Sequence, residues 1–394
     1  MNTLQKGIIT LLRSAITGET LSLPEDFTLD EALPILKKHS VAPLGYQGAV
    51  NCGLDKALPA MQQLLMLYLR ILMLHEHQAL ALNRLFEAFE KNEIAYMPLK
   101  GCIIKKLYPK PELRPMGDAD ILIHVEDHAR ICPIMEALGF TLKADTTHVF
   151  EWKSNTLFTE LHKSLVDERE TDYYAYYKSG WQLAIKGDGY RHDLSREDAY
   201  LFAFVHFAKH YRNRGIGCRQ LLDLYVYRSA WPDLDMAYLH KELTKLHLLE
   251  FFHNVQRTLD VWFHDAKSDP ITELITAFIF ASGNWGTMEA GIYAKEVKNA
   301  AKTNTLRNTE AKSLLRALFP PLQSMAYNHK ILRHFPVLLP FFWLRRAFRL
   351  VFFNPGKILR KLKLLRKVND TQILNYRDSL QAVGLDFHFD TESD

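Results

Sequence analysis

Two acidic residues, Asp118 and Asp120, stand one residue apart directly before the apolar segment Ile121–Ile123. Alternate residues of a β-strand point to the same face of a sheet, so both carboxylates are expected to reach one common point. Neighbouring carboxylates repel each other and usually need a cation, and two divalent ions held by shared carboxylates promote in-line phosphoryl or nucleotidyl transfer. The alternative interpretation is a simple turn, because Gly and Asp both favour turns.

A phosphate-binding segment is predicted just upstream of these acids. Residues 93–99 are typical of a short strand, and residues 102–108 of one or two helical turns, with Lys100 and Gly101 between them. A helix that begins at a glycine presents free backbone N–H groups and the positive end of its dipole, which favour an anion. Lys100 adds a positive charge at the same place. The sequence therefore predicts a phosphate site beside a metal site.

These motifs resemble those of a largely uncharacterised bacterial nucleotidyltransferase family. The similar residues are Leu99-Lys100-Gly101 and Leu113-Arg114-Pro115-Met116-Gly117-Asp118-Ala119-Asp120-Ile121-Leu122-Ile123. The family belongs to the DNA-polymerase-β-type superfamily, whose pattern is a Gly-Gly or Gly-Ser pair at a helix start, an Asp-x-Asp on the next strand and a third carboxylate on a later strand. Here Lys100-Gly101 stands in place of the Gly-Ser pair. The resemblance implies an α+β fold with a small mixed β-sheet core, flanked by N-terminal and C-terminal helical regions. It assigns the two acids to metal, and Lys100, Gly101, Arg114 and Gly117 to the nucleotide.

A predicted β-hairpin supplies the third carboxylate. Residues 147–162 are typical of two strands that turn at Lys153-Ser154-Asn155. Glu160 is the candidate because Glu160-Leu161-His162 resembles the family motif, with Asp145 and Glu151 as the alternatives. His162 shares the strand face of Glu160, and could orient a carboxylate or contact phosphate, although a single strand histidine is more often structural.

Further candidate residues lie outside the acidic motif. Arg114 enters the Asp118 loop, where a guanidinium could bind a phosphate bidentately or tie the loop to Glu112 or to a backbone carbonyl. His206 and His210 share one face of a predicted helix, a spacing that can bind metal. Together with Asp223 of the following segment they could form a metal phosphohydrolase site. In the alternative interpretation these side chains, with Arg219, pair between helices or line an acceptor pocket.

The sequence pattern divides the chain into four regions. Residues 1–92 are expected to be helical, with a capping box between Thr28 and Glu31. Residues 93–192 carry the predicted strands and form the nucleotidyltransferase core. Residues 193–320 are helical again and lie on the acceptor side, and residues 321–394 form a basic amphipathic region and tail.

The C-terminal stretch 331–368 is rich in Phe and Leu, and its charged residues are all basic. Such a stretch predicts either weak peripheral contact with an anionic membrane or a helical layer whose apolar side packs on the body and whose arginines are solvated.

Composition bounds these interpretations. The 394 residues are 24% charged and 48% hydrophobic, which are globular values. The net charge of +4 does not by itself indicate nucleic acid, and the four scattered cysteines predict neither disulfides nor zinc. The first residues lead into an amphipathic segment instead of an apolar signal core, and no run of about 20 uncharged apolar residues exists, so we expect a cytoplasmic protein.

Together these features predict a nucleotidyltransferase that uses two Mg²⁺ ions, or Mn²⁺, held by Asp118, Asp120 and Glu160. Its substrates would be an NTP, with ATP the first candidate, and an acceptor hydroxyl, with a small molecule favoured over protein or RNA and no role for DNA. The alternatives are a nucleotide-binding regulatory module without turnover, and the phosphohydrolase of the His206/His210 helix.

Overall fold

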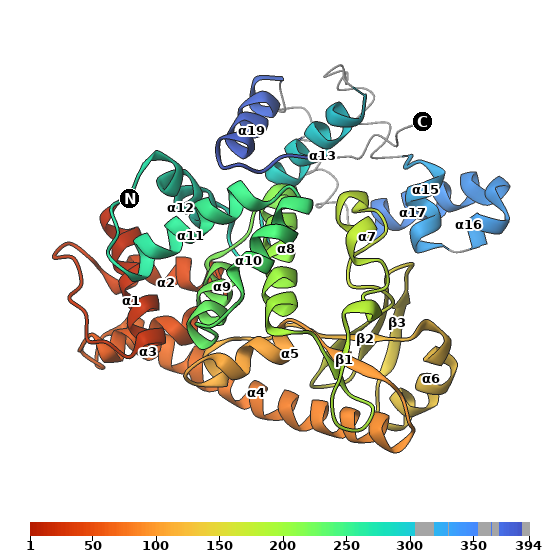
Figure 1. Ribbon diagram of the computed structural model, residues 1–394, viewed down its shortest axis with the longest axis horizontal. Coiled ribbons are helices and arrows are strands. Elements are labelled where there is room, and N and C mark those ends of the chain that lie inside the picture. The colour runs from red at the N-terminus through yellow and green to blue at the C-terminus, as the bar shows by residue number, and fades with distance from the viewer. Residues whose placement is uncertain (304–318, 330, 354–363, 365–369, 388–394) are drawn as a thin grey trace.

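The computed structural model describes residues 1–303, 319–329, 331–353, 364 and 370–387. A small β-sheet at one end of the molecule is flanked by N-terminal helices and by a large layer of helices that follow the sheet in sequence (Figure 1). This arrangement confirms the α+β fold expected from the motifs.

Four helices precede the sheet: α1 (Thr3–Thr17), α2 (Leu29–Lys38), α3 (Ala42–Asn51) and α4 (Pro59–Lys91). The expected capping box between Thr28 and Glu31 is wrong, because Thr28 lies at the N-cap of α2 but its side chain makes no capping hydrogen bond. A capping box forms instead at α1, between Asn2 and Gln5. The long helix α4 runs along the lower edge of the molecule and packs against the sheet (Figure 1).

The sheet has the strand order β1-β2-β5-β4-β3. Strands β2 and β5 are parallel, and the other neighbours are antiparallel. The predicted hairpin is confirmed as β4 and β5, whereas the edge strand β3 was not predicted. The strands and the short elements between them are β1 (Tyr96–Pro98), α5 (Gly101–Ile104), β2 (Ala119–Ile123), α6 (His128–Ala137), β3 (Thr141–Asp145), β4 (Val149–Lys153) and β5 (Phe158–His162).

Alternation along β2 determines where the acids point. Every residue of β2 is buried. Ile121 and Ile123 pack in the core that the sheet shares with α4, whereas Leu122 packs in the larger core of the helical layer. Because successive strand residues face opposite sides, Asp120 is on the side of Leu122 and faces the helical layer. The site therefore lies between the sheet and the helices that follow it.

The helical layer begins after a short helix and a two-stranded ribbon, β6 (Ile185–Lys186) with β7 (His192–Asp193). Aromatic residues of α8, including Phe204 and Phe207, pack against Phe251 of α11 in the centre of this layer. The short helix is α7 (Thr171–Tyr177), and the helices of the layer are α8 (Arg196–Arg214), α9 (Cys218–Ala230), α10 (Met236–Lys245), α11 (Leu249–Phe263), α12 (Pro270–Ser282), α13 (Met288–Thr303) and α19 (Asp370–Ala382).

A separate group of helices lies beside α7 and β3: α15 (Leu322–Asn328), α16 (Ile331–His334) and α17 (Leu339–Phe353) (Figure 1). They share a small apolar cluster built on Met325, Ala326 and Leu332. The basic residues of the C-terminal stretch that follow Phe353 (Lys357, Arg360, Lys361, Lys363, Arg366 and Lys367) lie outside the described residues. Among the helices that the structure describes, none combines the length and apolar character needed to cross a bilayer.

Candidate functional site

Asp120 and Glu160 are brought together by the pairing of the two parallel strands. They are register partners on β2 and β5, so their side chains project from adjacent positions on the same face. One ligand atom each from Asp120, Glu160 and His162 lies within 4.8 Å of the other two. Asp118, which precedes β2, lines the same cavity but does not belong to this group of three. Within the described residues, this is the one cluster of three or more metal-ligating side chains.

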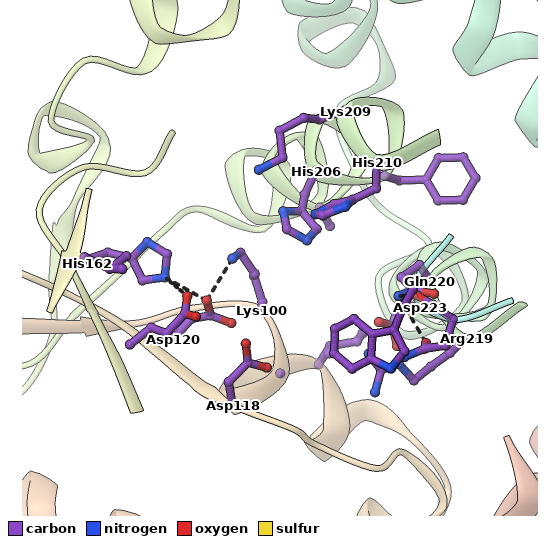
Figure 2. A pocket seen from close by; sticks show the side chains of 18 of the residues that line it. Lys100, Asp118, Asp120, His162, His206, Lys209, His210, Arg219, Gln220 and Asp223 are labelled. Atoms are coloured by element: carbon purple, nitrogen blue, oxygen red, sulfur yellow. Dashed lines mark hydrogen bonds and ion pairs between the residues drawn. The ribbon is translucent and has the colours of Figure 1, made fainter. Parts of the chain in front are cut away.

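Lys100 binds one of these acids directly. Its ammonium lies 2.8 Å from Oδ1 of Asp120 (Figure 2). The backbone of Lys100 has a φ of +43°, a left-handed conformation that non-glycine residues rarely adopt and that costs about 1–3 kcal/mol. This conformation turns the chain from β1 into α5 and directs the lysine toward the acids. The structure therefore places Lys100, which was predicted to bind phosphate, against a carboxylate of the site.

Gly101 is required by close packing. A Cβ added there would lie 2.7 Å from Nη1 of Arg114 and 3.3 Å from the Met116 side chain. Gly101 begins α5, which has only four residues. Gly117, by contrast, is exposed, and a Cβ there would make only an ordinary contact with Trp285, at 3.9 Å. The structure gives no steric reason for glycine at position 117.

His162 orients Asp120 from the other side. Its Nε2 lies 2.7 Å from Oδ1 of Asp120 and 3.5 Å from Oε2 of Glu160. Burial and the nearby Lys100 ammonium lower the pKa of His162, in spite of the hydrogen bond to Asp120. A neutral His162 that donates its Nε2–H to Asp120 fits these contacts. Its other ring nitrogen, Nδ1, is buried and has no hydrogen-bond partner among the described residues.

The three carboxylates have different proton affinities. Burial disfavours charge on Asp120, but the Lys100 ammonium and the hydrogen bond from His162 outweigh it and hold the pKa of Asp120 below its usual range. Burial, together with the charges of Asp120 and Asp118, raises the pKa of Glu160 to about 7. Burial and the charge of Asp120 also raise the pKa of Asp118. The site thus holds one firmly ionised acid and two whose ionisation is disfavoured by burial and by the neighbouring negative charge.

Arg114 pairs with Asp223, a partner that the sequence analysis did not propose for it. Its guanidinium forms a bidentate pair with Asp223 of α9, with Nη2 2.8 Å from Oδ2 and Nε 3.2 Å from Oδ1. Tyr108 donates a further hydrogen bond of 2.8 Å to Asp223. The candidate Glu112 instead accepts a hydrogen bond from Tyr68. Because Arg114 and Asp223 neutralise each other in a buried position, they fasten the Asp118 loop to α9.

Two more contacts hold the same loop. Arg219 of α9 donates a hydrogen bond of 2.9 Å to the carbonyl of Pro115, and Gln78 of α4 donates one of 3.1 Å to the carbonyl of Met116. The loop is therefore fixed on both sides just before Asp118. Burial and the neighbouring Arg114 lower the pKa of Arg219 to about 10.

His206, Lys209 and His210 of α8 form the wall opposite the acids (Figure 2). The two histidine rings lie 4.4 Å apart, and burial lowers the pKa of both well below 6.5. Since they do not converge with Asp223 into a cluster of metal ligands among the described residues, the geometry does not support the phosphohydrolase alternative.

Lys209 was not identified as a site residue from the sequence, because only the two histidines on either side of it suggested chemistry. Its ammonium points into the cavity (Figure 2) and has no hydrogen bond or ion pair among the described residues. Burial and the nearby Lys100 lower its pKa to about 8. An unpaired cation that faces a cavity is positioned to bind an anionic group of a ligand.

The cavity between these walls has a volume of about 390 Å³. Volumes of this size are typical of sites for small molecules and cofactors. The sheet wall carries the carboxylates with Lys100, and the helical wall carries Lys209 and Arg219. Carboxylates and positively charged side chains therefore face the same cavity, an arrangement suited to a polyanion that binds together with a cation.

The fold and the site define an α+β protein with a carboxylate cluster on a small mixed sheet, which is the class expected for a nucleotidyltransferase. A family model described as an uncharacterised nucleotidyltransferase matches residues 25–264, and the chain belongs to this family. The matched range contains β1 to β5, α8 and α9, so it includes both walls of the cavity. No match was found among curated proteins or among solved structures.

Proposed function

We propose that this chain transfers a nucleoside monophosphate from an NTP to an acceptor hydroxyl, with divalent metal, and releases pyrophosphate. The observation that carries the proposal is the convergence of Asp120 and Glu160 from paired strands, with Asp118 in the same cavity. Membership of the nucleotidyltransferase family supports the general activity. The nucleotide, with ATP the first candidate, the acceptor and the metal belong to the proposal.

The donor set suits Mg²⁺ or Mn²⁺. Asp118, Asp120 and Glu160 would hold the metal, since carboxylate oxygens are the ligands that Mg²⁺ and Mn²⁺ prefer. A bound cation would relieve the repulsion between these carboxylates, which together with burial raises the pKa values of Glu160 and Asp118. His162 is the residue that orients Asp120. The bound cations would supply charge neutralisation for the phosphates.

The remaining residues have separate roles in the proposed transfer. The acceptor oxygen forms a bond to the α-phosphorus while the bond from that phosphorus to the β-bridging oxygen breaks, and pyrophosphate leaves. Glu160 or Asp120 would accept the proton of the acceptor hydroxyl. Lys100 and the unpaired Lys209 hold the departing phosphates from the two walls of the cavity. Holding the reactants in place and neutralising their charge provide most of the catalysis in this reaction class.

The ion pair between Lys100 and Asp120 favours a second candidate, which is nucleotide binding without turnover. A lysine that stays on Asp120 would occupy a metal-binding oxygen. Calorimetry would support this candidate if it detected Mg-dependent NTP binding while no pyrophosphate formed during long incubation with cell extract.

The test of transfer is pyrophosphate release from ATP and Mg²⁺ in the presence of cell extract as a source of acceptor. Asp118→Ala and Asp120→Ala are each expected to lower the rate by several orders of magnitude, because they remove metal ligands. Glu136→Gln, which changes an exposed carboxylate on α6, is the matched control and should retain the full rate. Normal pyrophosphate release by Asp118→Ala would overturn the assignment.

A further inference from the structure

Helix α17 has two apolar faces, of which one packs in a small apolar cluster and the other is largely exposed. Leu339, Phe342 and Trp343 pack on the small cluster of α15 and α16. Phe341, Leu344 and Phe348 lie on the opposite face, where their side chains are 61%, 72% and 58% exposed. Their spacing of three and four residues places them on one side of the helix. An exposed stripe of large apolar side chains usually marks an interaction surface.

Further exposed apolar side chains lie in the segment before α17. Val337 is 82% exposed and Phe335 is 57% exposed, and Ile331 at the start of α16 is also exposed. The docking face, as we name this surface, consists of Ile331, Phe335, Val337, Phe341, Leu344 and Phe348. It is concentrated in one part of the molecule, on the group of helices that lies beside α7 and β3 (Figure 1).

The chain segment that carries the docking face has charged residues of one sign. The sequence from 311 to 369 contains no Asp or Glu, whereas it contains many Lys and Arg residues. Within the described part Arg345 is exposed, and so is Arg333, whose guanidinium lies 3.4 Å from the carboxylate of Glu168. Large apolar side chains that are surrounded by basic residues fit the boundary between lipid headgroups and acyl chains, where anionic lipids attract the cations. A second copy of this segment is not favoured as the partner, because its own basic residues would face one another.

We propose that the docking face binds the surface of an anionic bilayer without crossing it. The apolar side chains enter the headgroup region, and the arginines bind lipid phosphates. Helix α17, at 15 residues, fits an interfacial helix.

The docking face is connected to the cavity through α15. Tyr327 of α15 lines the cavity and donates a hydrogen bond of 3.0 Å to Asp167, which follows β5. The guanidinium of Arg169 stacks on the Tyr327 ring at 3.5 Å. Membrane binding would therefore hold the cavity near the bilayer. If the chain is a nucleotidyltransferase as proposed above, this placement favours an acceptor hydroxyl on a molecule at the membrane surface. This part of the inference rests on the proposed function.

Vesicle flotation tests the binding without any dependence on catalysis. The full chain is expected to float with vesicles of equal parts phosphatidylglycerol and phosphatidylcholine, to stay unbound with phosphatidylcholine alone, and to be released by high salt. Leu344→Gln with Phe348→Gln should lower the partition coefficient about a hundredfold, since two inserted side chains lose their apolar contact. Arg345→Gln should lower it about fivefold.

The matched control removes exposed apolar side chains from another part of the surface. Met66 and Met73 on α4 are 68% and 64% exposed, and Met66→Gln with Met73→Gln should leave flotation unchanged. The far-UV circular dichroism spectrum and the thermal unfolding midpoint should be the same in the wild type and the α17 variant, which shows that the variant remains folded.

Three results would overturn the proposal. The first is equal binding to both kinds of vesicle, and the second is wild-type flotation by the Leu344→Gln, Phe348→Gln variant. The third is a self-association, or a complex with RNA, that this variant abolishes while vesicle binding is absent. Loss of pyrophosphate release would not bear on any of these readouts, so the two proposals fail independently.

Discussion

Replacing Glu160 by glutamine should make the metal-free protein more stable at alkaline pH. Burial and the charges of Asp120 and Asp118 raise the pKa of Glu160 from 4.5 to about 7. The folded protein therefore holds a proton that the unfolded chain has released between these two pH values. The stability contributed by this group is fully present below pH 4.5 and is lost as the pH rises through 7.

The size of the effect follows from the same pKa. Each unit of pKa is worth about 1.4 kcal/mol, so a change from 4.5 to about 7 corresponds to about 3 kcal/mol. The Glu160 side chain is 26% exposed, so solvent screening makes this an upper value. At pH 8 without metal, Glu160→Gln should exceed the wild type in the free energy of unfolding by up to about 3 kcal/mol. Below pH 4.5 the two should be equal.

Urea unfolding in EDTA at several pH values measures this difference. Glu136→Gln, the exposed control on α6, should follow the wild type throughout. Added Mg²⁺ should stabilise the wild type at pH 8 and have a much smaller effect on Glu160→Gln, because the variant lacks one of the proposed ligands. A parallel pH dependence of wild type and Glu160→Gln would refute the reasoning about this carboxylate.

Three further predictions concern the loop, the helical wall and the histidine. Asp223→Asn leaves the buried Arg114 without its ionised partner and should lower the free energy of unfolding by about 3–5 kcal/mol, whereas a change below about 1 kcal/mol in chemical denaturation would contradict the pairing. Lys209→Met should weaken ATP binding in Mg²⁺ about tenfold by calorimetry, and an unchanged affinity would remove Lys209 from the phosphate site. His162→Phe removes the hydrogen bond to Asp120, so Mn²⁺ affinity should fall about tenfold or more, and His162→Gln should restore part of it; equal affinities in both variants and the wild type would contradict the orienting role.

The sheet residues at the site were predictable because their signal is local. Short stretches of sequence are enough to predict three features. These are the Asp118–Asp120 spacing, the buried strand that follows it and the hairpin that carries Glu160. The family motif then related β2 to β5. Strand β3 was missed because it is an edge strand, in which Thr141, Leu142 and Lys143 are exposed, so it lacks the apolar alternation that identifies a half-buried strand.

The partners of the charged residues were not predictable from local sequence. Arg114 and Asp223 are separated by 109 residues and meet only because α9 packs on the loop. Lys209 was hidden for the same reason, since its direction into the cavity depends on how α8 faces the sheet. The positive φ of Lys100 could not be predicted from the sequence either, because glycine and not lysine is the usual residue at positive φ.

The most direct test of nucleotidyl transfer compares ATP labelled in the α-phosphate with ATP labelled in the γ-phosphate, each incubated with the wild-type chain, Mg²⁺ and cell extract. We predict that the α-label enters an acceptor, that the γ-label is recovered in pyrophosphate, and that Asp120→Ala abolishes both. Transfer of the γ-label to an acceptor, or its release as inorganic phosphate while the α-label stays in nucleotide, would contradict the proposed function.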